Sequence, residues 1–280
     1  MSFLSSLMNA LPGAVAQGLA WGIMAIGVYI TFRILDVADL TVDGSLATGG
    51  AVCVMLIRAG VNPWLAMLCA LVSGMLAGLV TGLFHTRCGI PAILAGILTQ
   101  LALYSINLRI MGGKANQAVS VDKYHLLLSQ RYVRELSLDN PLPLLVVLTA
   151  VIVAALYWFF GTEKGSSVRA TGANPHMARA QGINTSANIV LGLMLSNGLV
   201  ALSGALLAQY QGSSDINMGR GAIVYYIVLQ IVLQIGLNTN DLKLITALIV
   251  ALFLTLSYLN LKKTRRKPRR AAKEGVEQHA

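Results

Sequence analysis

The chain has 280 residues, of which 56% are hydrophobic and only 11% are charged, with a mean hydropathy of +0.69. Soluble globular proteins carry about 25% charged residues, so this composition excludes a soluble globular domain and indicates a protein whose main solvent is lipid. The net charge of +10 does not indicate nucleic-acid binding, because seven of the 21 basic residues lie between Lys262 and Arg270, directly after a hydrophobic run, and no base-reading module accompanies them.

Eight apolar runs predict the fold class, because a helix needs about 20 apolar residues to cross a bilayer. We predict an all-α fold: a polytopic transmembrane helix bundle with broken or half-helices, over residues 1–261, followed by a basic cytoplasmic tail at 262–280. Glycines spaced by four, at Gly18 and Gly22 and again at Gly74, Gly78 and Gly82, predict helix-packing faces. The predicted spans are Pro12–Leu35, Leu46–Ile57, Pro63–Phe84, Pro91–Met111, Pro141–Phe160, Asn188–Ala208, Ala222–Leu237 and Leu242–Leu259.

The stretch Asp36–Ser45 (DVADLTVDGS) is the densest polar feature beside an apolar run. A helical segment would put its three aspartates on one face, and Asp43 followed by glycine and serine is typical of a helix start. One interpretation is a broken helix whose first amides face a substrate path, with Asp39, Thr41, Asp43 and Ser45 as path candidates. The alternative is a cytoplasmic loop whose acids are hydrated or pair with Arg33.

Two later segments offer further candidates for a polar path. Gln100 and Asn107 interrupt the fourth apolar run, which begins with a proline-led helix start at Gly89–Pro91, although hydrogen bonds between helices explain them equally well. The segment Gln209–Asn217 follows the sixth run and contains Gln211 and Asp215. It predicts either an external gate or contact surface for a delivering protein, or a hydrated loop.

The polar segment between the fifth and sixth runs predicts a short capped surface helix. Asn174 can cap it, Pro175 suits its first position, and Gly182 can end it. The basic residues of 161–182 place this segment in the cytoplasm, where such a helix has the form of a docking element.

Catalytic and metal-binding motifs are missing from the sequence. It contains no phosphate-binding loop and no nucleophile with a base and an orienting group, and Cys53, Cys69 and Cys88 stand singly. We therefore expect no enzyme activity, no metal site and no cofactor in this chain.

The predicted number of membrane crossings does not agree with the predicted side of the C-terminal tail. If the segment 161–182 and the tail are both cytoplasmic, eight crossings leave the tail on the wrong side. Either the seventh run is re-entrant, or runs are miscounted, or a span is absent between the sixth run and the last.

Several motifs together resemble the ABC importer permeases of the branched-chain amino-acid and ribose permease superfamily. Over nearly the whole chain they are similar to one subgroup of these permeases. Its members are assigned to the transport of tryptophan or tyrosine, or have no assigned solute. The motifs are Asp36–Ser45 (DVADLTVDGS), Gly89–Gly96 (GIPAILAG), Leu103–Gly112 (LYSINLRIMG), Arg169–Thr185 (RATGANPHMARAQGINT) and Leu202–Gln211 (LSGALLAQYQ). The family continues after a segment like Gly219–Val224 with a further span, so we hypothesise that a segment is missing at 224/225.

The resemblance implies a membrane-spanning subunit of an ATP-driven importer for amino acids or similar small solutes, in the bacterial plasma membrane with a cytoplasmic C-terminus. It implies a second permease copy, cytoplasmic ATPase subunits that hold ATP and Mg²⁺, and an extracytoplasmic binding protein. Within the coupling loop 161–183, Met177 and Ala178 would face the ATPase. The implied coupling residues are Arg169, Asn174, Pro175, Met177, Ala178, Arg179, Gln181 and Gly182.

Two other functions fit the sequence without that resemblance. One is a secondary transporter or channel that works alone, and the other is a membrane scaffold. The substrate cannot be identified from the sequence, nor whether the two permease copies are identical.

Overall fold

The computed structural model describes residues 3–119, 124, 126–129, 142–216 and 218, and these form a helix bundle, as predicted. The last two predicted spans, the 224/225 junction and the basic tail lie outside the described residues. The elements in chain order are α1 (Phe3–Tyr29), the π-helix η1 (Ile30–Ile34), α2 (Val42–Arg58), α3 (Pro63–Thr86), α4 (Ala92–Ile110), β1 (Asn116–Ala118), α6 (Leu142–Gly161), α7 (Glu163–Ala173), α8 (Pro175–Ala180), α9 (Thr185–Gln211) and β2 (Ser213–Asp215).

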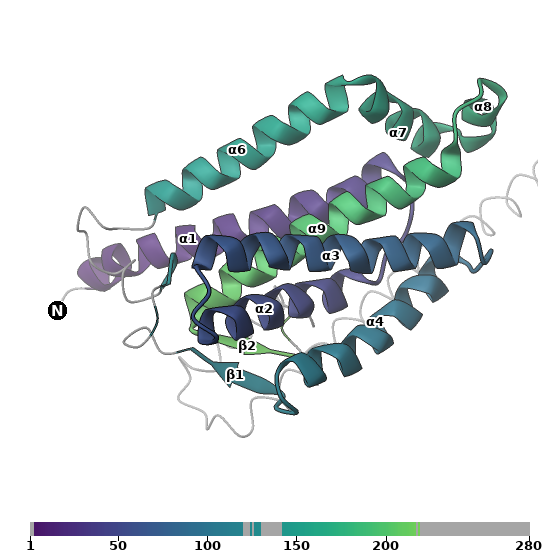
Figure 1. Ribbon diagram of the computed structural model, residues 1–280. Helices are drawn as coiled ribbons and strands as arrows, with labels where there is room; N and C mark the ends of the chain where they lie inside the picture. The colour runs from purple at the N-terminus through teal and green to yellow at the C-terminus, as the bar shows by residue number, and fades with distance from the viewer. Residues whose placement is uncertain (1–2, 120–123, 125, 130–141, 217, 219–280) are drawn as a thin grey trace, which may run out of the picture. The chain divides into compact units, whose positions relative to one another are not determined.

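Five segments among the described residues are long and apolar enough to cross a membrane. They are Pro12–Ile34, Pro63–Thr86, Ala92–Ile110, Leu142–Gly161 and Thr185–Gln211. The 17-residue α2 is shorter, about 25 Å at 1.5 Å per residue. Ser45 in its first turn donates a hydrogen bond to Asn197, near the middle of α9, so α2 begins inside the bundle and not at its end (Figure 1).

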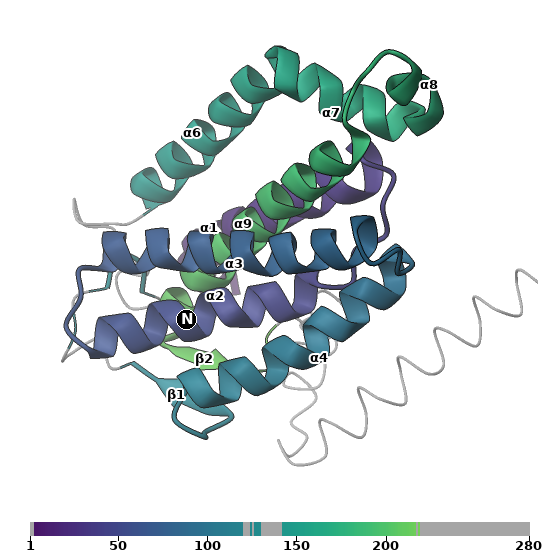
Figure 2. The ribbon, with the colours of Figure 1, turned by 45° about the vertical axis from the view of Figure 1, so that its right-hand side comes forward.

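Helix α9 is the centre of the bundle and packs against α1, α2 and α3 (Figures 1 and 2). Glycines make these contacts close. A Cβ on Gly49 of α2 would collide with the carbonyl group of Ala201, and one on Gly74 of α3 would collide with the backbone at Asn197. Such backbone contact suits helices in lipid, where packing and not the hydrophobic effect holds helices together.

The predicted glycine face is confirmed on α3, and on α1 the described residues make no such contact. Gly78 and Gly82 both pack closely on α9, as Gly74 does. Around Gly18 and Gly22, by contrast, no atom of the described chain lies within 4 Å of an added Cβ. Within the described part of the chain, the same spacing therefore marks a close helix contact in α3 and none in α1.

The chain leaves the helical conformation between η1 and α2. Asp36 has a φ of 54°, in the left-handed region, and residues 36–40 carry no helix. The condition for three aspartates on one helical face is therefore not met: Asp36 is exposed, Asp39 is buried and Asp43 is half-buried in the first turn of α2. The broken helix itself is present.

The two ends of α9 define the two ends of the bundle. Its first residue follows α8, and its last residue leads into β2, which pairs antiparallel with β1. A helix of 27 residues is about 40 Å long, more than the roughly 30 Å of bilayer hydrocarbon. The α7–α8 segment and the small sheet thus lie at opposite ends (Figure 1).

Candidate functional site

A buried polar network joins the start of α2 to α9. The Asp39 carboxylate accepts hydrogen bonds from the backbone N–H of Thr41 at 2.8 Å and from Asn197 Nδ2 at 2.7 Å. Asn197 Oδ1 accepts a third bond from Ser45 Oγ at 2.6 Å. All these side chains are at most 3% exposed, so the network satisfies an acid that would be costly to bury alone.

Thr41 extends this network to α3. It occupies the N-cap of α2, two residues before the predicted cap at Asp43, and its side chain makes no capping bond. Instead its hydroxyl pairs with that of Thr81 at 2.8 Å. Three of the predicted path residues, Asp39, Thr41 and Ser45, therefore hold the start of α2 against its neighbours.

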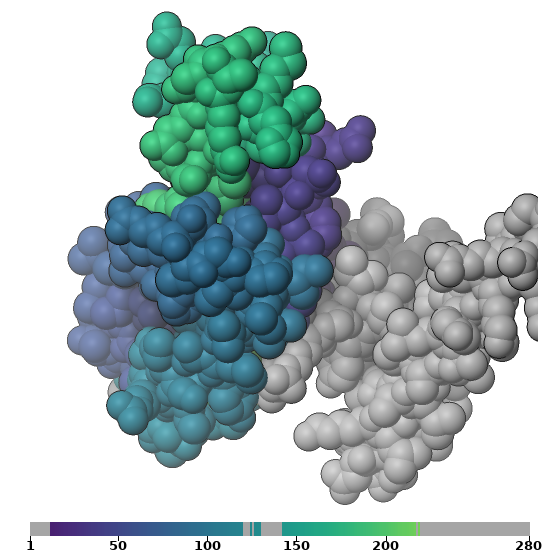
Figure 3. Space-filling view, turned by 90° about the vertical axis from the view of Figure 1, so that its right-hand side faces the viewer, coloured from purple at the N-terminus to yellow at the C-terminus, as the bar shows by residue number. Residues whose placement is uncertain are grey.

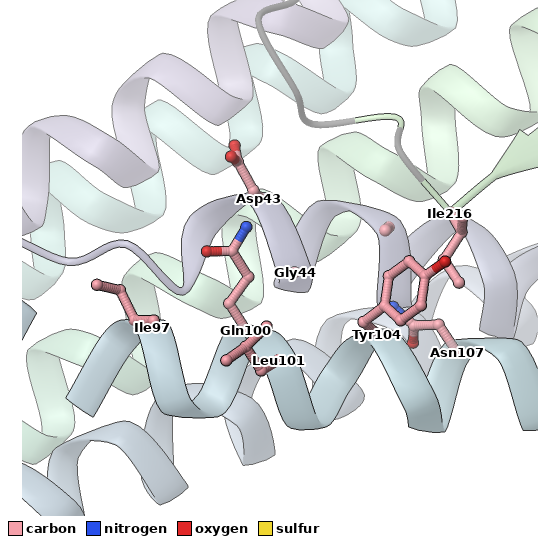
Figure 4. A pocket seen from close by; sticks show the side chains of 9 residues that line it. Asp43, Gly44, Ile97, Gln100, Leu101, Tyr104, Asn107 and Ile216 are labelled. Atoms are coloured by element: carbon pink, nitrogen blue, oxygen red, sulfur yellow. The ribbon is translucent and has the colours of Figure 1, made fainter. Parts of the chain in front are cut away.

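Three other predicted path residues meet at a cavity of about 380 Å³ between α2 and α4. Figure 4 shows Gln100 reaching from α4 toward the first turn of α2, with the Tyr104 ring further along α4. The cavity is lined by Asp43, Gly44, Ala47, Ile97, Gln100, Leu101, Tyr104, Asn107 and Ile216. The close approach of the two helices here depends on Gly44, whose missing side chain leaves room for Gln100 and Leu103.

The remaining two path candidates lie at the other end of the bundle. Gln211 ends α9 and is half-buried. Asp215 lies in strand β2, opposite Asn116 of β1, whose amide nitrogen is 3.5 Å from the carboxylate. The predicted loop is thus partly a strand. Only the next residue, Ile216, reaches the cavity wall.

The predicted surface helix is confirmed in α8. The Asn174 side chain accepts hydrogen bonds from the backbone N–H groups of His176 and Met177 at 3.1 and 3.0 Å. Pro175 occupies the first helical position. Gly182 follows the helix with a φ of 80°, a conformation that favours glycine.

The predicted coupling residues divide by exposure. Met177 is 61% exposed, whereas Ala178 is 3% exposed and packs into the chain. The expectation that both face outward is therefore wrong for Ala178. Pro175, Arg179 and Gln181 are exposed, and Arg179 Nε donates to Thr185 Oγ1 at 2.8 Å.

Arg169 does not lie on α8. It is an exposed residue of α7 and lines a separate cavity of about 600 Å³ between the α1–η1 segment and the α6–α7 segment. Among the described residues, no three His, Cys, Asp or Glu side chains gather as a metal ion would require.

Comparison with known proteins identifies the family. Residues 11–266 match the model of the branched-chain amino acid transport system permease component. The chain is 36% identical to the tyrosine transport system permease protein of Clostridioides difficile, over 93% of this chain and 96% of the relative. It is 29% identical to the autoinducer 2 import system permease protein LsrC of Yersinia pestis, over 83% of this chain and 64% of the relative.

No solved structure matches the chain. The family match covers most of the residues, and five helices among the described residues are long and apolar enough to cross a membrane. The chain therefore belongs to the branched-chain amino acid transport system permease family, and it is the membrane-spanning permease subunit of a solute importer.

Proposed function

We propose that this permease is driven by a cytoplasmic ATPase that binds α8 and the surrounding loop 161–183. ATP and Mg²⁺ would be bound by that ATPase, an extracytoplasmic binding protein would deliver the solute, and a second permease copy would complete the pore. The exposed Met177 on a capped helix is the observation that carries this proposal. Figure 3 shows the green region around α8 projecting beyond the blue surfaces of α3 and α4.

The α7–α8 segment is attached to the rest of the bundle by contacts that could transmit a movement. Thr171 Oγ1 accepts a bond from Asn188 of α9 at 3.0 Å, which ties α7 to the central helix. Gly172 packs against the backbone of Ile34 in η1. Movement of α8 would therefore pass through α7 to η1, and from there to the non-helical stretch that leads into α2.

The polar path proposed here begins where that stretch ends. Its candidates are Asp39, Thr41, Asp43, Ser45, Gln100, Asn107, Gln211 and Asp215. The shared cavity of Asp43, Gln100 and Asn107 supports the middle of this set. The network at Asp39 would hold α2 in place in one state and release it in another.

We propose an amino acid with an aromatic side chain as the solute. The 36% identity to a tyrosine transport system permease supports this class. By the positive-inside rule, α8 and the C-terminal tail would lie in the cytoplasm, and the β1–β2 end would face the binding protein. The membrane would be the bacterial plasma membrane.

We expect Met177→Asp to release the ATPase. A docked methionine would be removed from water, and an aspartate in its place would bury a charge, so retention of the ATPase during purification should fall about tenfold or more. Met177→Leu keeps an apolar side chain of similar volume and should retain the ATPase. Because the residue is 61% exposed, the free energy of unfolding of both variants should lie within about 0.5 kcal/mol of that of the parent. Full retention of the ATPase by a folded Met177→Asp protein would contradict the docking proposal.

A further inference from the structure

Asn107 carries an unsatisfied polar atom at the cavity between α2 and α4. The residue is 1% exposed, and its Oδ1 has no hydrogen-bond partner in the described part of the chain. Most buried polar groups in proteins are hydrogen-bonded, and an orphaned acceptor is costly. Its neighbours on the buried stripe of α4 show the contrast, since the Thr99 hydroxyl donates to the carbonyl of Ala95 at 3.0 Å.

This acceptor requires a hydrogen-bond donor, and the ammonium group is the strong donor that an amino acid carries. In Figure 4 the Gln100 side chain reaches from α4 toward the first turn of α2, whereas the Asp43 carboxylate points away from α4. The amides of Asn107 and Gln100 therefore supply the polar groups on the α4 side of the cavity.

The other residues that line the cavity suit an apolar or aromatic part of a solute. Ile97, Leu101 and Ile216 supply aliphatic surface, and the Tyr104 ring is 43% exposed beside them. Aromatic rings stack with gains beyond their buried area. The volume of about 380 Å³ falls within the range of small-molecule sites.

From these observations we propose that the permease itself binds the transported solute in this cavity, with Asn107 Oδ1 accepting a hydrogen bond from the ammonium group of the solute. The inference rests on the proposed transport function and adds that selection takes place inside the membrane domain as well as on a delivering protein. The recognised class is a small amphipathic amine. The carboxylate of an amino acid has no part in this contact, since the described residues that line the cavity include no Lys or Arg.

The test is direct binding to the purified full-length permease in nanodiscs, without a binding protein. Radiolabelled tyrosine is the probe, and two analogues compete with it: tyramine, which lacks the carboxylate, and 3-(4-hydroxyphenyl)propionate, which lacks the ammonium group. We expect saturable tyrosine binding that tyramine displaces and the propionate does not. No tyrosine binding, or displacement by the propionate alone, would overturn the inference.

Two variants assign the binding to the cavity. Asn107→Leu removes the orphaned acceptor without leaving a void, so its melting temperature should be unchanged or higher while tyrosine binding weakens about tenfold to a hundredfold. Thr99→Val on the same buried stripe should bind as the parent does. Normal binding by Asn107→Leu would refute the assignment.

These outcomes separate the binding site from the proposed function. If a system containing Asn107→Leu takes up solute with ATP at the parental rate, the cavity assignment is refuted and the importer proposal is unaffected. Tyrosine binding by a permease that no ATPase drives would do the reverse.

Discussion

Gly49→Ala in α2 should strongly destabilise the permease. The added Cβ would overlap the backbone carbonyl group of Ala201 in α9, and a backbone group cannot turn aside as a flexible side chain can. The two helices must therefore separate, with a loss of packing along their whole contact. Overpacked sites of this kind cost about 3 kcal/mol, or a fall of about 6–12 °C in the melting temperature of a chain of this size. The measurement is the fraction of monodisperse protein that survives heating in detergent.

Gly18→Ala in α1 is the matched control for this change. It is also a glycine within a long apolar helix, and no atom of the described chain lies within 4 Å of its added Cβ. Alanine favours a helix over glycine by about 0.5–1 kcal/mol, so this variant should melt at or slightly above the parent. Equal melting of Gly49→Ala and Gly18→Ala would contradict the close α2–α9 contact.

Asn197→Leu in α9 should be the second strongly destabilising change. It removes the amide that donates to the Asp39 carboxylate and that accepts from Ser45. Asp39 is only 3% exposed, so the lost bond leaves a poorly satisfied carboxylate away from water. The expected cost is about 3–4 kcal/mol, read as a lower melting temperature and lower yield of folded protein.

Asn188→Leu on the same helix is the control for that loss. Asn188 makes one neutral hydrogen bond, to Thr171, at a half-buried position, so its replacement should cost about 1 kcal/mol. Asp39→Asn added to Asn197→Leu should recover part of the stability, because the buried charge is gone. If Asn197→Leu were no more harmful than Asn188→Leu, the network would not hold α2 in place.

Sequence reasoning succeeded where the signal is local. Apolar length predicted the five long apolar helices among the described residues, although α2, the second predicted span, is shorter than they are. The order of Asn174, Pro175 and Gly182 predicted α8 with its cap, first turn and end. Each of these features depends on residues within a few positions of one another. The glycine spacing of α3 was equally informative, but the same spacing in α1 makes no close contact with the described residues.

The sequence could not predict contacts between distant residues. Asn197 was missed, although an amide in the middle of an apolar helix is a signal that such a residue has a partner. Its partner Asp39 lies 158 positions away in the chain. Asp36 has a left-handed backbone conformation directly before the non-helical stretch. Because it is not a glycine, nothing in the local sequence predicts that conformation. Asp43, Gln100 and Asn107 were each chosen singly, and only the fold brings them to one cavity.

The hypothesis of a missing segment at 224/225 stays a prediction, because that junction lies outside the described residues. One comparison bears on it without locating the position. The alignment to the tyrosine transport system permease spans 293 positions, more than the 280 residues of this chain. That relative therefore has residues with no counterpart here.

The most direct test of the importer account is uptake by proteoliposomes that contain this permease, its ATPase and its binding protein. Accumulation of radiolabelled tyrosine against its gradient should require ATP and an intact α8, and Met177→Asp should abolish it while Met177→Leu does not. Accumulation that continues without the ATPase, driven by an ion gradient across the liposome membrane, would show instead a transporter that works alone.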